Sequence, residues 1–293
     1  MRTRSICLLL FLLLLGCAWT ASAEELYFQK QSFPSDAASI DLGNIRVSDW
    51  NKFYNFLDQF EHLQHVDMFS TRVTGKRADE MTERYPGVSF GWTLSFGDHT
   101  VRTDATAFST LHWSGAKVHS GTEISVVRYC KQLKALDIGH NGVKDLSFLY
   151  ELPELRVLII ACNKVEDITP IGSLTKLEYL EMFSNQVTDL TPLHNLDHLM
   201  DLNIGYNRIG DVSQVYAMPQ LKRLWMYNCI NRNRHVKISE DELKELHKHL
   251  PETIIDTTHN PSEGGWRTGS HYETIHEIFQ KGTYIPFDDS IPE

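Results

Sequence analysis

The sequence predicts an α/β solenoid with a concave parallel β-sheet, irregular N-terminal repeats and a C-terminal cap. Its middle section contains a pattern that recurs every 22 residues, opening at Leu133, Leu155, Leu177, Leu199 and Leu221. Each copy reads Leu-x-x-Leu-x-Ile/Met, in which apolar side chains alternate as they do on a strand with one buried face. One such strand cannot bury that face alone, so successive copies are expected to stack into a parallel sheet.

A polar residue follows each predicted strand at a fixed distance, at Asn141, Asn163, Asn185 and Asn207, with Cys229 in the fifth copy. A buried side-chain amide can both donate to and accept from the backbone of adjacent turns. We therefore interpret these five positions as a structural ladder, in which Cys229 is small enough to take the same place. Four copies continue with an aspartate that is suited to cap a short helical turn on the convex side, at Asp145, Asp167, Asp189 and Asp211.

The full pattern is clearest where Asn185-Gln-Val-Thr-Asp-Leu-Thr-Pro-Leu193 follows a strand. It resembles the bacterial leucine-rich repeats of the 22-residue, internalin-like class, over residues 133–229 or about a third of the chain. The resemblance implies a curved leucine-rich-repeat solenoid with a concave parallel sheet. The resemblance also implies a role in adhesion or host interaction. It does not imply that this chain binds the receptor of any internalin.

The first 23 residues are predicted to be a secretory signal peptide. Arg2 and Arg4 precede an apolar run of ten residues, Ile6–Leu15, which is too short to span a bilayer. Ala21-Ser-Ala23 then supplies the small residues of a cleavage site. The alternative is a lipid anchor at Cys17, because Leu14-Leu-Gly-Cys17 resembles a bacterial lipobox. Either processing route predicts a secreted or cell-surface protein without a transmembrane segment in its mature chain.

The remainder divides into four parts: a linker at 24–36, irregular N-terminal repeats at 37–132, the five regular repeats at 133–229, and a C-terminal helix and cap at 230–293. The N-terminal repeats are expected to contain strands near 40–42, 63–68 and 108–113, helices at 48–62 and 78–85, and an inserted hairpin at 92–105. Ser239 starts a helix that ends at Leu250, and a last strand is expected at 253–255. Residues 259–293 are expected to cover the open end of the solenoid.

Charge and composition exclude some classes of partner. The chain has 28 Lys and Arg against 38 Asp and Glu, a net charge of −10, so it lacks the basic surface that nucleic acid requires. Hydrophobic residues make up 42%, as in folded globular proteins. Beyond the signal peptide, Cys130, Cys162 and Cys229 are an odd number without the pairing of a zinc site.

The sequence predicts neither a catalytic site nor a metal site nor a cofactor. Among 14 histidines, His194 and His198 lie in a turn, and His247 and His249 point to different sides of a helix. The aspartate column has a capping role, which weighs against calcium. After the repeats, about 64 residues remain, too few for a separate catalytic domain of ordinary size. We therefore predict a protein that is not an enzyme.

The concave face carries the residues that the scaffold does not require. We predict a ligand-binding surface there, formed by Ile159, Tyr179, Glu181, Phe183, Asp201, Arg223, Trp225 and Tyr227. Aromatic residues beside arginine are typical of binding hot spots, and an exposed apolar cluster on a secreted protein usually marks an interaction site. The alternative is that the C-terminal tail or a neighbouring molecule covers these residues.

The function predicted from the sequence is that of a secreted or surface-held bacterial protein that binds an extracellular or surface protein through its concave face. The alternatives are a self-associating structural protein of the cell envelope and a glycan-binding module, since aromatic surfaces also hold sugars.

Overall fold

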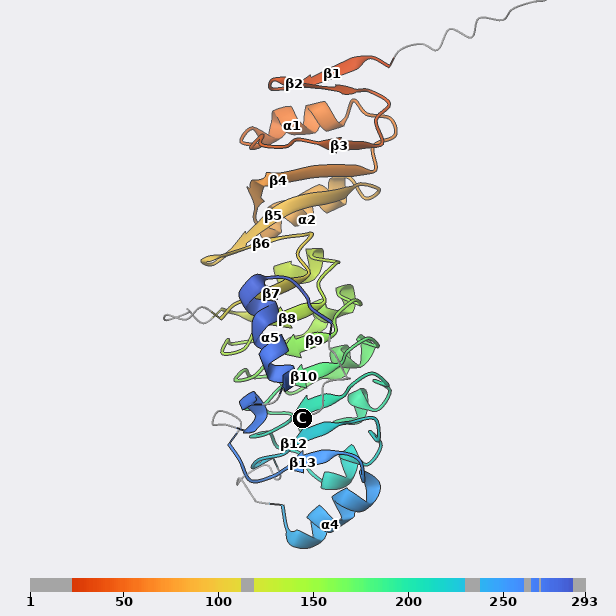
Figure 1. Cartoon of the computed structure of the whole chain (residues 1–293). Helices are drawn as coiled ribbons and strands as arrows, with labels where there is room; N and C mark the ends of the chain where they lie inside the picture. The colour runs from red at the N-terminus through yellow and green to blue at the C-terminus, as the bar shows by residue number, and fades with distance from the viewer. Residues whose placement is uncertain (1–22, 112–118, 230–237, 261–264, 269, 287–293) are drawn as a thin grey trace, which may run out of the picture.

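The computed structural model describes residues 23–111, 119–229, 238–260, 265–268 and 270–286. Its strands form three sheets stacked along one elongated solenoid (Figure 1). The predicted signal peptide, apart from Ala23, and its alternative anchor Cys17 lie outside these residues. Within the described residues, no helix combines the length and the apolar character needed to cross a bilayer.

The N-terminal end is a β-hairpin made of β1 (Glu25–Phe28) and β2 (Gln31–Pro34). Residues 25–34 of the predicted linker therefore form a hairpin. Phe28 and Phe33 are buried and their rings pack against Phe56 of α1 (Trp50–Leu57), at centroid distances of 5.0 and 5.6 Å. This apolar packing orders the segment and covers the first end of the core.

The second sheet contains the irregular repeats. Its strands β3 (Ser39–Asp41), β4 (His65–Val73) and β5 (Ser89–Phe96) are parallel, and β6 (His99–Arg102) returns antiparallel to β5. The predicted hairpin is thus confirmed, and its turn contains Gly97 at φ +53°. Helices α1 and α2 (Gly75–Arg84) pack beside these strands. Because β6 ends the parallel pairing, the regular repeats begin a separate sheet.

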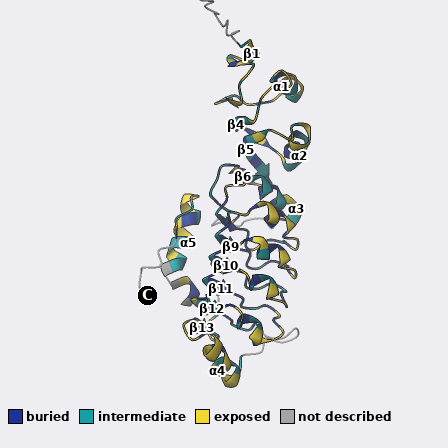
Figure 2. Ribbon diagram, turned by 90° about the vertical axis from the view of Figure 1, so that its right-hand side faces the viewer, coloured by how far each residue is buried: buried dark blue, intermediate teal, exposed yellow. Residues whose placement is uncertain are grey.

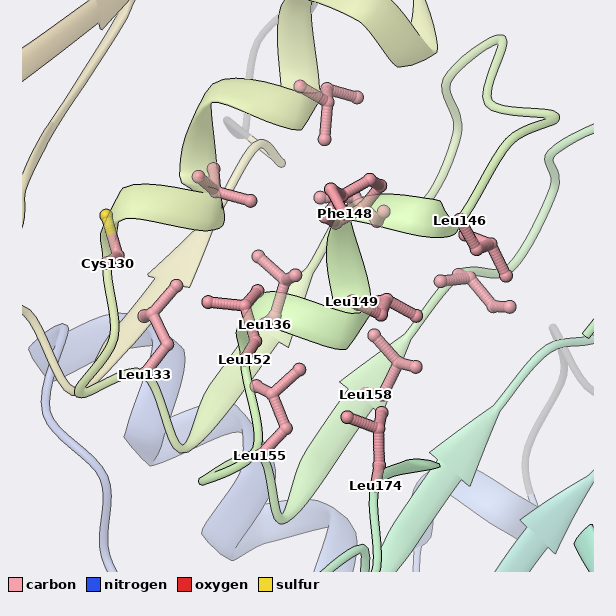
Figure 3. Close-up of a cluster of buried hydrophobic side chains, with 14 of the residues drawn as sticks. Cys130, Leu133, Leu136, Leu146, Phe148, Leu149, Leu152, Leu155, Leu158 and Leu174 are labelled. Carbon is pink, nitrogen blue, oxygen red and sulfur yellow. The ribbon is translucent and has the colours of Figure 1, made fainter. Parts of the chain in front are cut away.

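That third sheet, here called the concave sheet, has seven parallel strands in register: β7 (Ala107–Ser109), β8 (Ala135–Asp137), β9 (Val157–Ile159), β10 (Tyr179–Glu181), β11 (Asp201–Asn203), β12 (Arg223–Trp225) and β13 (Ile254–Asp256). Short helices form the opposite, convex side: α3 (Gly121–Ile124) and the 3-10 turns η1 (Ser125–Tyr129), η2 (Ser147–Glu151), η3 (Thr169–Ser173), η4 (Thr191–Leu193) and η5 (Val212–Val215). The leucines between the two sides are buried (Figure 3).

The asparagines after the strands hydrogen-bond to neighbouring repeats. Asn185 accepts from the backbone N–H of Val165 at 3.0 Å and donates to the carbonyls of Ile160 and Met182 at 2.9 and 3.1 Å. Asn163 and Asn207 make the same bonds one repeat away. In the last repeat, the backbone carbonyl of Cys229 accepts from Ile209 N–H at 2.8 Å instead. The residue preceding each position of the structural ladder, Asn141 included, adopts a positive φ, at His140, Cys162, Ser184, Tyr206 and Asn228.

The C-terminal part differs from the cap that the sequence predicted. Helix α4 (Glu240–His249), with a capping box between Ser239 and Glu242, lies beyond the last 3-10 turn, at the far end of the solenoid. The following residues, η6 (Gly265–Thr268) and α5 (Ser270–Lys281), turn back and run along the concave sheet (Figure 2). We call residues 265–268 and 270–286 the C-terminal segment. It covers the open face rather than the open end, because that face retains apolar side chains.

Candidate functional site

The concave sheet brings the eight predicted binding residues together, but it does not leave them exposed. Most of them are at most 8% exposed, and Arg223 and Tyr227 are half-buried. Exposure of this surface was therefore a wrong expectation, and the alternative of cover by the C-terminal tail is confirmed. The physical reason is the apolar character of the surface, which forms a buried cluster with Trp266, Ile275 and Ile278 of the C-terminal segment. The binding role of the eight residues stays a prediction.

Trp266 is the central contact of this cover. The centroid of its indole ring lies 5.4 Å from the centroid of the Tyr179 ring and 5.6 Å from that of the Trp225 ring. Its N–H donates to the Tyr179 hydroxyl oxygen at 2.8 Å and to the Glu181 carboxylate at 3.2 Å. The Tyr179 hydroxyl in turn donates to Glu181 at 3.0 Å. An aromatic residue of the same chain thus occupies the predicted hot spot.

Polar contacts hold the rest of the C-terminal segment in place. His271 Nδ1 lies 2.6 Å from an Asp201 carboxylate oxygen, and Arg223 contacts both oxygens of the same carboxylate at 2.6 and 3.0 Å. At the other end, the Tyr284 hydroxyl donates to Glu178 at 3.1 Å. The segment is therefore anchored at both ends of α5.

A cavity of about 340 Å³ remains open between α5 and strands β7 to β10. Its walls combine apolar and aromatic side chains with acidic, imidazole and guanidinium groups, and they are formed by Ser109, Leu111, Asp137, Gly139, His140, Ile159, Ala161, Glu181, Arg267, Tyr272, Ile275, His276, Phe279 and Gln280. We call it the acidic cavity, because the carboxylates of Asp137 and Glu181 both line it.

The two carboxylates are buried and differ in their partners. Asp137 accepts from the Ser109 hydroxyl at 2.9 Å and from the Gly139 N–H at 3.0 Å. Burial nevertheless raises the pKa of Asp137 to about 7, with a contribution from the charge of Glu181. Burial also raises the pKa of Glu181, which the hydrogen bonds from Tyr179 and Trp266 oppose. The exposed Arg267 is the nearby cation that favours ionisation of both.

Two buried carboxylates in an open cavity can hold a cation that brings its own hydrogen-bond donors. Asp137 and the C-terminal residues were missing from the residues predicted to bind a ligand. A signal for the C-terminal residues was present, since Ile275, Ile278 and Phe279 follow Trp266 at helical spacing and form one apolar face. No signal in the sequence indicates which face of the solenoid that helix covers.

The raised pKa of Asp137 predicts a pH-dependent stability. In the folded protein the carboxyl keeps its proton up to about pH 7, whereas in the unfolded chain it ionises near 3.8. At this carboxyl the folded state therefore binds more protons in this range, and the contribution of Asp137 to the free energy of unfolding falls as the pH rises from 4 to 7. We therefore expect the free energy of unfolding of Asp137→Asn, relative to that of the parent, to rise by an amount on the order of 4 kcal/mol between pH 4 and pH 7.

Urea unfolding at several pH values measures this difference. Asp167→Asn is the control, because hydrogen bonds from Thr169 lower the pKa of Asp167. We expect the free energy of unfolding of Asp167→Asn to lie below that of the parent at neutral pH, and this difference should shrink in acid. Parallel profiles for the parent and Asp137→Asn would contradict the assignment.

Comparisons with known proteins agree with the repeat pattern. A family model described as "Leucine Rich repeats (2 copies)" matches residues 131–173 and 153–198, and a second leucine-rich-repeat model matches 196–213. A search of curated proteins finds no match.

Solved structures with a similar fold include internalin C2 of Listeria monocytogenes, at 19% identity, covering 64% of this chain and 80% of that one, with a TM-score of 0.39. Another internalin of that species, InlF, shows 17% identity, 70% coverage of each chain and a TM-score of 0.35. A leucine-rich-repeat protein of Leptospira interrogans shows 14% identity, 68% and 74% coverage and a TM-score of 0.37. The family-model matches, the registered repeats and the parallel concave sheet together show that this chain contains leucine-rich repeats over residues 131–213, within a leucine-rich-repeat solenoid.

Proposed function

We propose that this chain is a secreted or surface-held bacterial binding protein whose acidic cavity receives a lysine or arginine side chain of an extracellular protein. The observation that carries the proposal is the pair of buried carboxylates, Asp137 and Glu181, in the wall of an open cavity. The C-terminal segment leaves this part of the concave sheet accessible while it covers the aromatic part.

The walls fit a long cationic side chain. Ile159, Ile275 and Phe279 supply apolar surface for a methylene stem, and the carboxylates lie where a charged head group would gain hydrogen bonds. Arg267 also lines the cavity, and an added cationic head group would favour the ionised form of Asp137, whose pKa burial raises to about 7. This gives the predicted concave-face binding a defined chemistry.

The remaining predicted properties belong to the same proposal. Secretion or surface attachment rests on the N-terminal sequence, and adhesion or host interaction on the resemblance to internalins. Leucine-rich-repeat proteins of this type are generally protein-interaction modules, which favours binding over catalysis for the acidic cavity.

Selection of displayed peptides tests the proposal without a known partner. A library of random linear peptides is selected on the parent protein and on Asp137→Asn/Glu181→Gln, which removes both charges and keeps side-chain size. Glu166→Gln/Glu252→Gln is the control, because it removes the same charge from two exposed positions. We expect the parent and the control to enrich the same lysine- or arginine-containing peptides, with a loss of affinity of about 30-fold or more in the cavity variant, as truncating a buried charge partner costs about 2–5 kcal/mol.

Other outcomes distinguish the alternatives. Enriched peptides without a basic residue, or equal binding by the cavity variant, would reject the acidic cavity as the site. Retention of oligosaccharides in place of peptides would favour the glycan-binding alternative. Sedimentation that shows the parent associating with itself, and both the cavity variant and the control doing the same, would favour the alternative of a self-associating structural protein.

A further inference from the structure

We propose that Asp98, His99 and His119 form a binding site for a divalent transition-metal ion, with zinc as the preferred occupant. These residues lie outside the acidic cavity, where the β5–β6 hairpin meets the chain before α3. The site is independent of the proposed partner binding. It would connect the irregular N-terminal repeats to the first regular repeat.

Three potential ligand atoms converge there. Asp98 Oδ1 lies 3.1 Å from His119 Nε2 and 3.5 Å from His99 Nε2. One ligand atom from each residue lies within 4.8 Å of the other two. Ligand atoms about 2.0–2.2 Å from a tetrahedral Zn²⁺ are separated by roughly 3.3 Å, which matches the two shorter distances. Binding would require the two imidazole nitrogens to approach each other from their present separation, which is at most 4.8 Å.

The surroundings hold both imidazoles in this orientation. The rings of His99 and His119 lie 4.8 Å apart at 68°; both pack against Phe96, and His99 also packs against Phe108. The His119 ring also lies directly on Gly97, where a Cβ atom would come within 2.4 Å of its Cε1 atom. The two histidine side chains are 1% and 4% exposed, whereas the Asp98 side chain is 47% exposed. An ion can therefore enter from the aspartate side.

The backbone favours the same orientation. His119 N–H donates to Asn141 Oδ1 at 2.8 Å, which fixes this residue to the asparagine ladder. The Glu123 carboxylate lies 4.0 Å from His119 Nδ1, too far for a hydrogen bond, and accepts from Ser120. It would have to move closer to become the outer carboxylate partner that a metal-bound histidine usually has.

The donor set determines the class of ion. Two imidazoles and one carboxylate suit zinc and other late transition metals, whereas calcium and magnesium prefer oxygen ligands alone. Three protein ligands leave a coordination position for water. The sequence did not reveal this site because His119 is 20 residues away from the Asp98-His99 pair.

Zinc titration of the full chain, monitored by calorimetry, tests the proposal. Metals are removed from the protein with EDTA before the titration. We expect one equivalent of Zn²⁺ to bind and to raise the thermal unfolding temperature. Asp98→Asn and His99→Gln should each weaken binding by more than about 100-fold, because loss of even an outer partner costs about 10–100-fold. The matched control is His194→Gln/His198→Gln, which removes two histidines on the convex side and should bind as the parent does.

A second measurement does not depend on the folding of any variant. X-ray absorption of the parent with one equivalent of Zn²⁺ is expected to show two imidazole nitrogens and oxygen ligands. Absence of binding at micromolar zinc, unchanged binding by Asp98→Asn and His99→Gln, or a sulfur ligand in the absorption spectrum would each overturn the proposal.

Discussion

Replacing Trp266 by alanine is expected to release the C-terminal segment from the concave sheet. The indole is 5% exposed, lies between Tyr179 and Trp225, and donates to Glu181, so its loss removes packing and leaves a buried carboxylate with one donor fewer. Truncation of a buried aromatic residue typically costs about 3–5 kcal/mol. Urea unfolding, monitored by tryptophan fluorescence and by the helical circular-dichroism signal of the whole chain, measures the loss of stability.

Two further variants define the origin of this effect. Trp266→Phe keeps a ring but not the N–H, so we expect a smaller loss of about 1–3 kcal/mol. Tyr150→Ala removes an aromatic ring that is 54% exposed on the convex side, and should change the stability by less than about 0.5 kcal/mol. If Trp266→Ala were as stable as Tyr150→Ala, the described contact would not hold the segment.

Replacing Asn185 by alanine is expected to cost about 2–4 kcal/mol. The substitution leaves the buried N–H of Val165 without its partner, which costs about 1–3 kcal/mol, and removes one of the two amide donors to the carbonyl of Ile160, which keeps its bond from Asn163. Because these groups belong to the preceding repeat, the loss should also weaken the contact between adjacent repeats. Equilibrium unfolding and amide hydrogen exchange across β9 and β10 measure both effects.

Asn195 provides the comparison, because it is exposed in the loop after η4 of the same repeat. Asn195→Ala is expected to unfold within about 0.5 kcal/mol of the parent. Equal losses in Asn185→Ala and Asn195→Ala would mean that the ladder does not stabilise the stack.

The regular repeats could be predicted because their signal is local and repeated. An alternating Leu-x-Ile/Met strand fixes which side chains are buried, and the 22-residue period fixes the register of five strands. The hairpin at Gly97-Asp98 was predicted from a turn of two residues between two alternating runs. The hairpin at 25–34 was missed because its stability depends on Phe28 and Phe33 meeting α1, a contact that no local pattern encodes.

The candidate site depends on contacts between distant parts of the chain. The concave columns place Tyr179, Glu181 and Trp225 side by side, and this grouping follows from the period alone. Their burial follows from Trp266, which is 85 residues from Glu181 in the sequence. Whether an aromatic surface meets its own chain or a partner is decided by tertiary packing, so the sequence left both alternatives open.

The central claim is that the chain's own C-terminal segment occupies the concave sheet. Cys162 is a native probe of this claim, since it packs against the covered cluster and is partly exposed, whereas Cys130 and Cys229 are buried in the core. The measurement is the rate of alkylation of each thiol, resolved by peptide mass spectrometry, in the parent and in Trp266→Ala. We predict faster alkylation of Cys162 alone in the variant. Equal rates at Cys162 in both proteins, with Cys130 and Cys229 still protected, would contradict the claim.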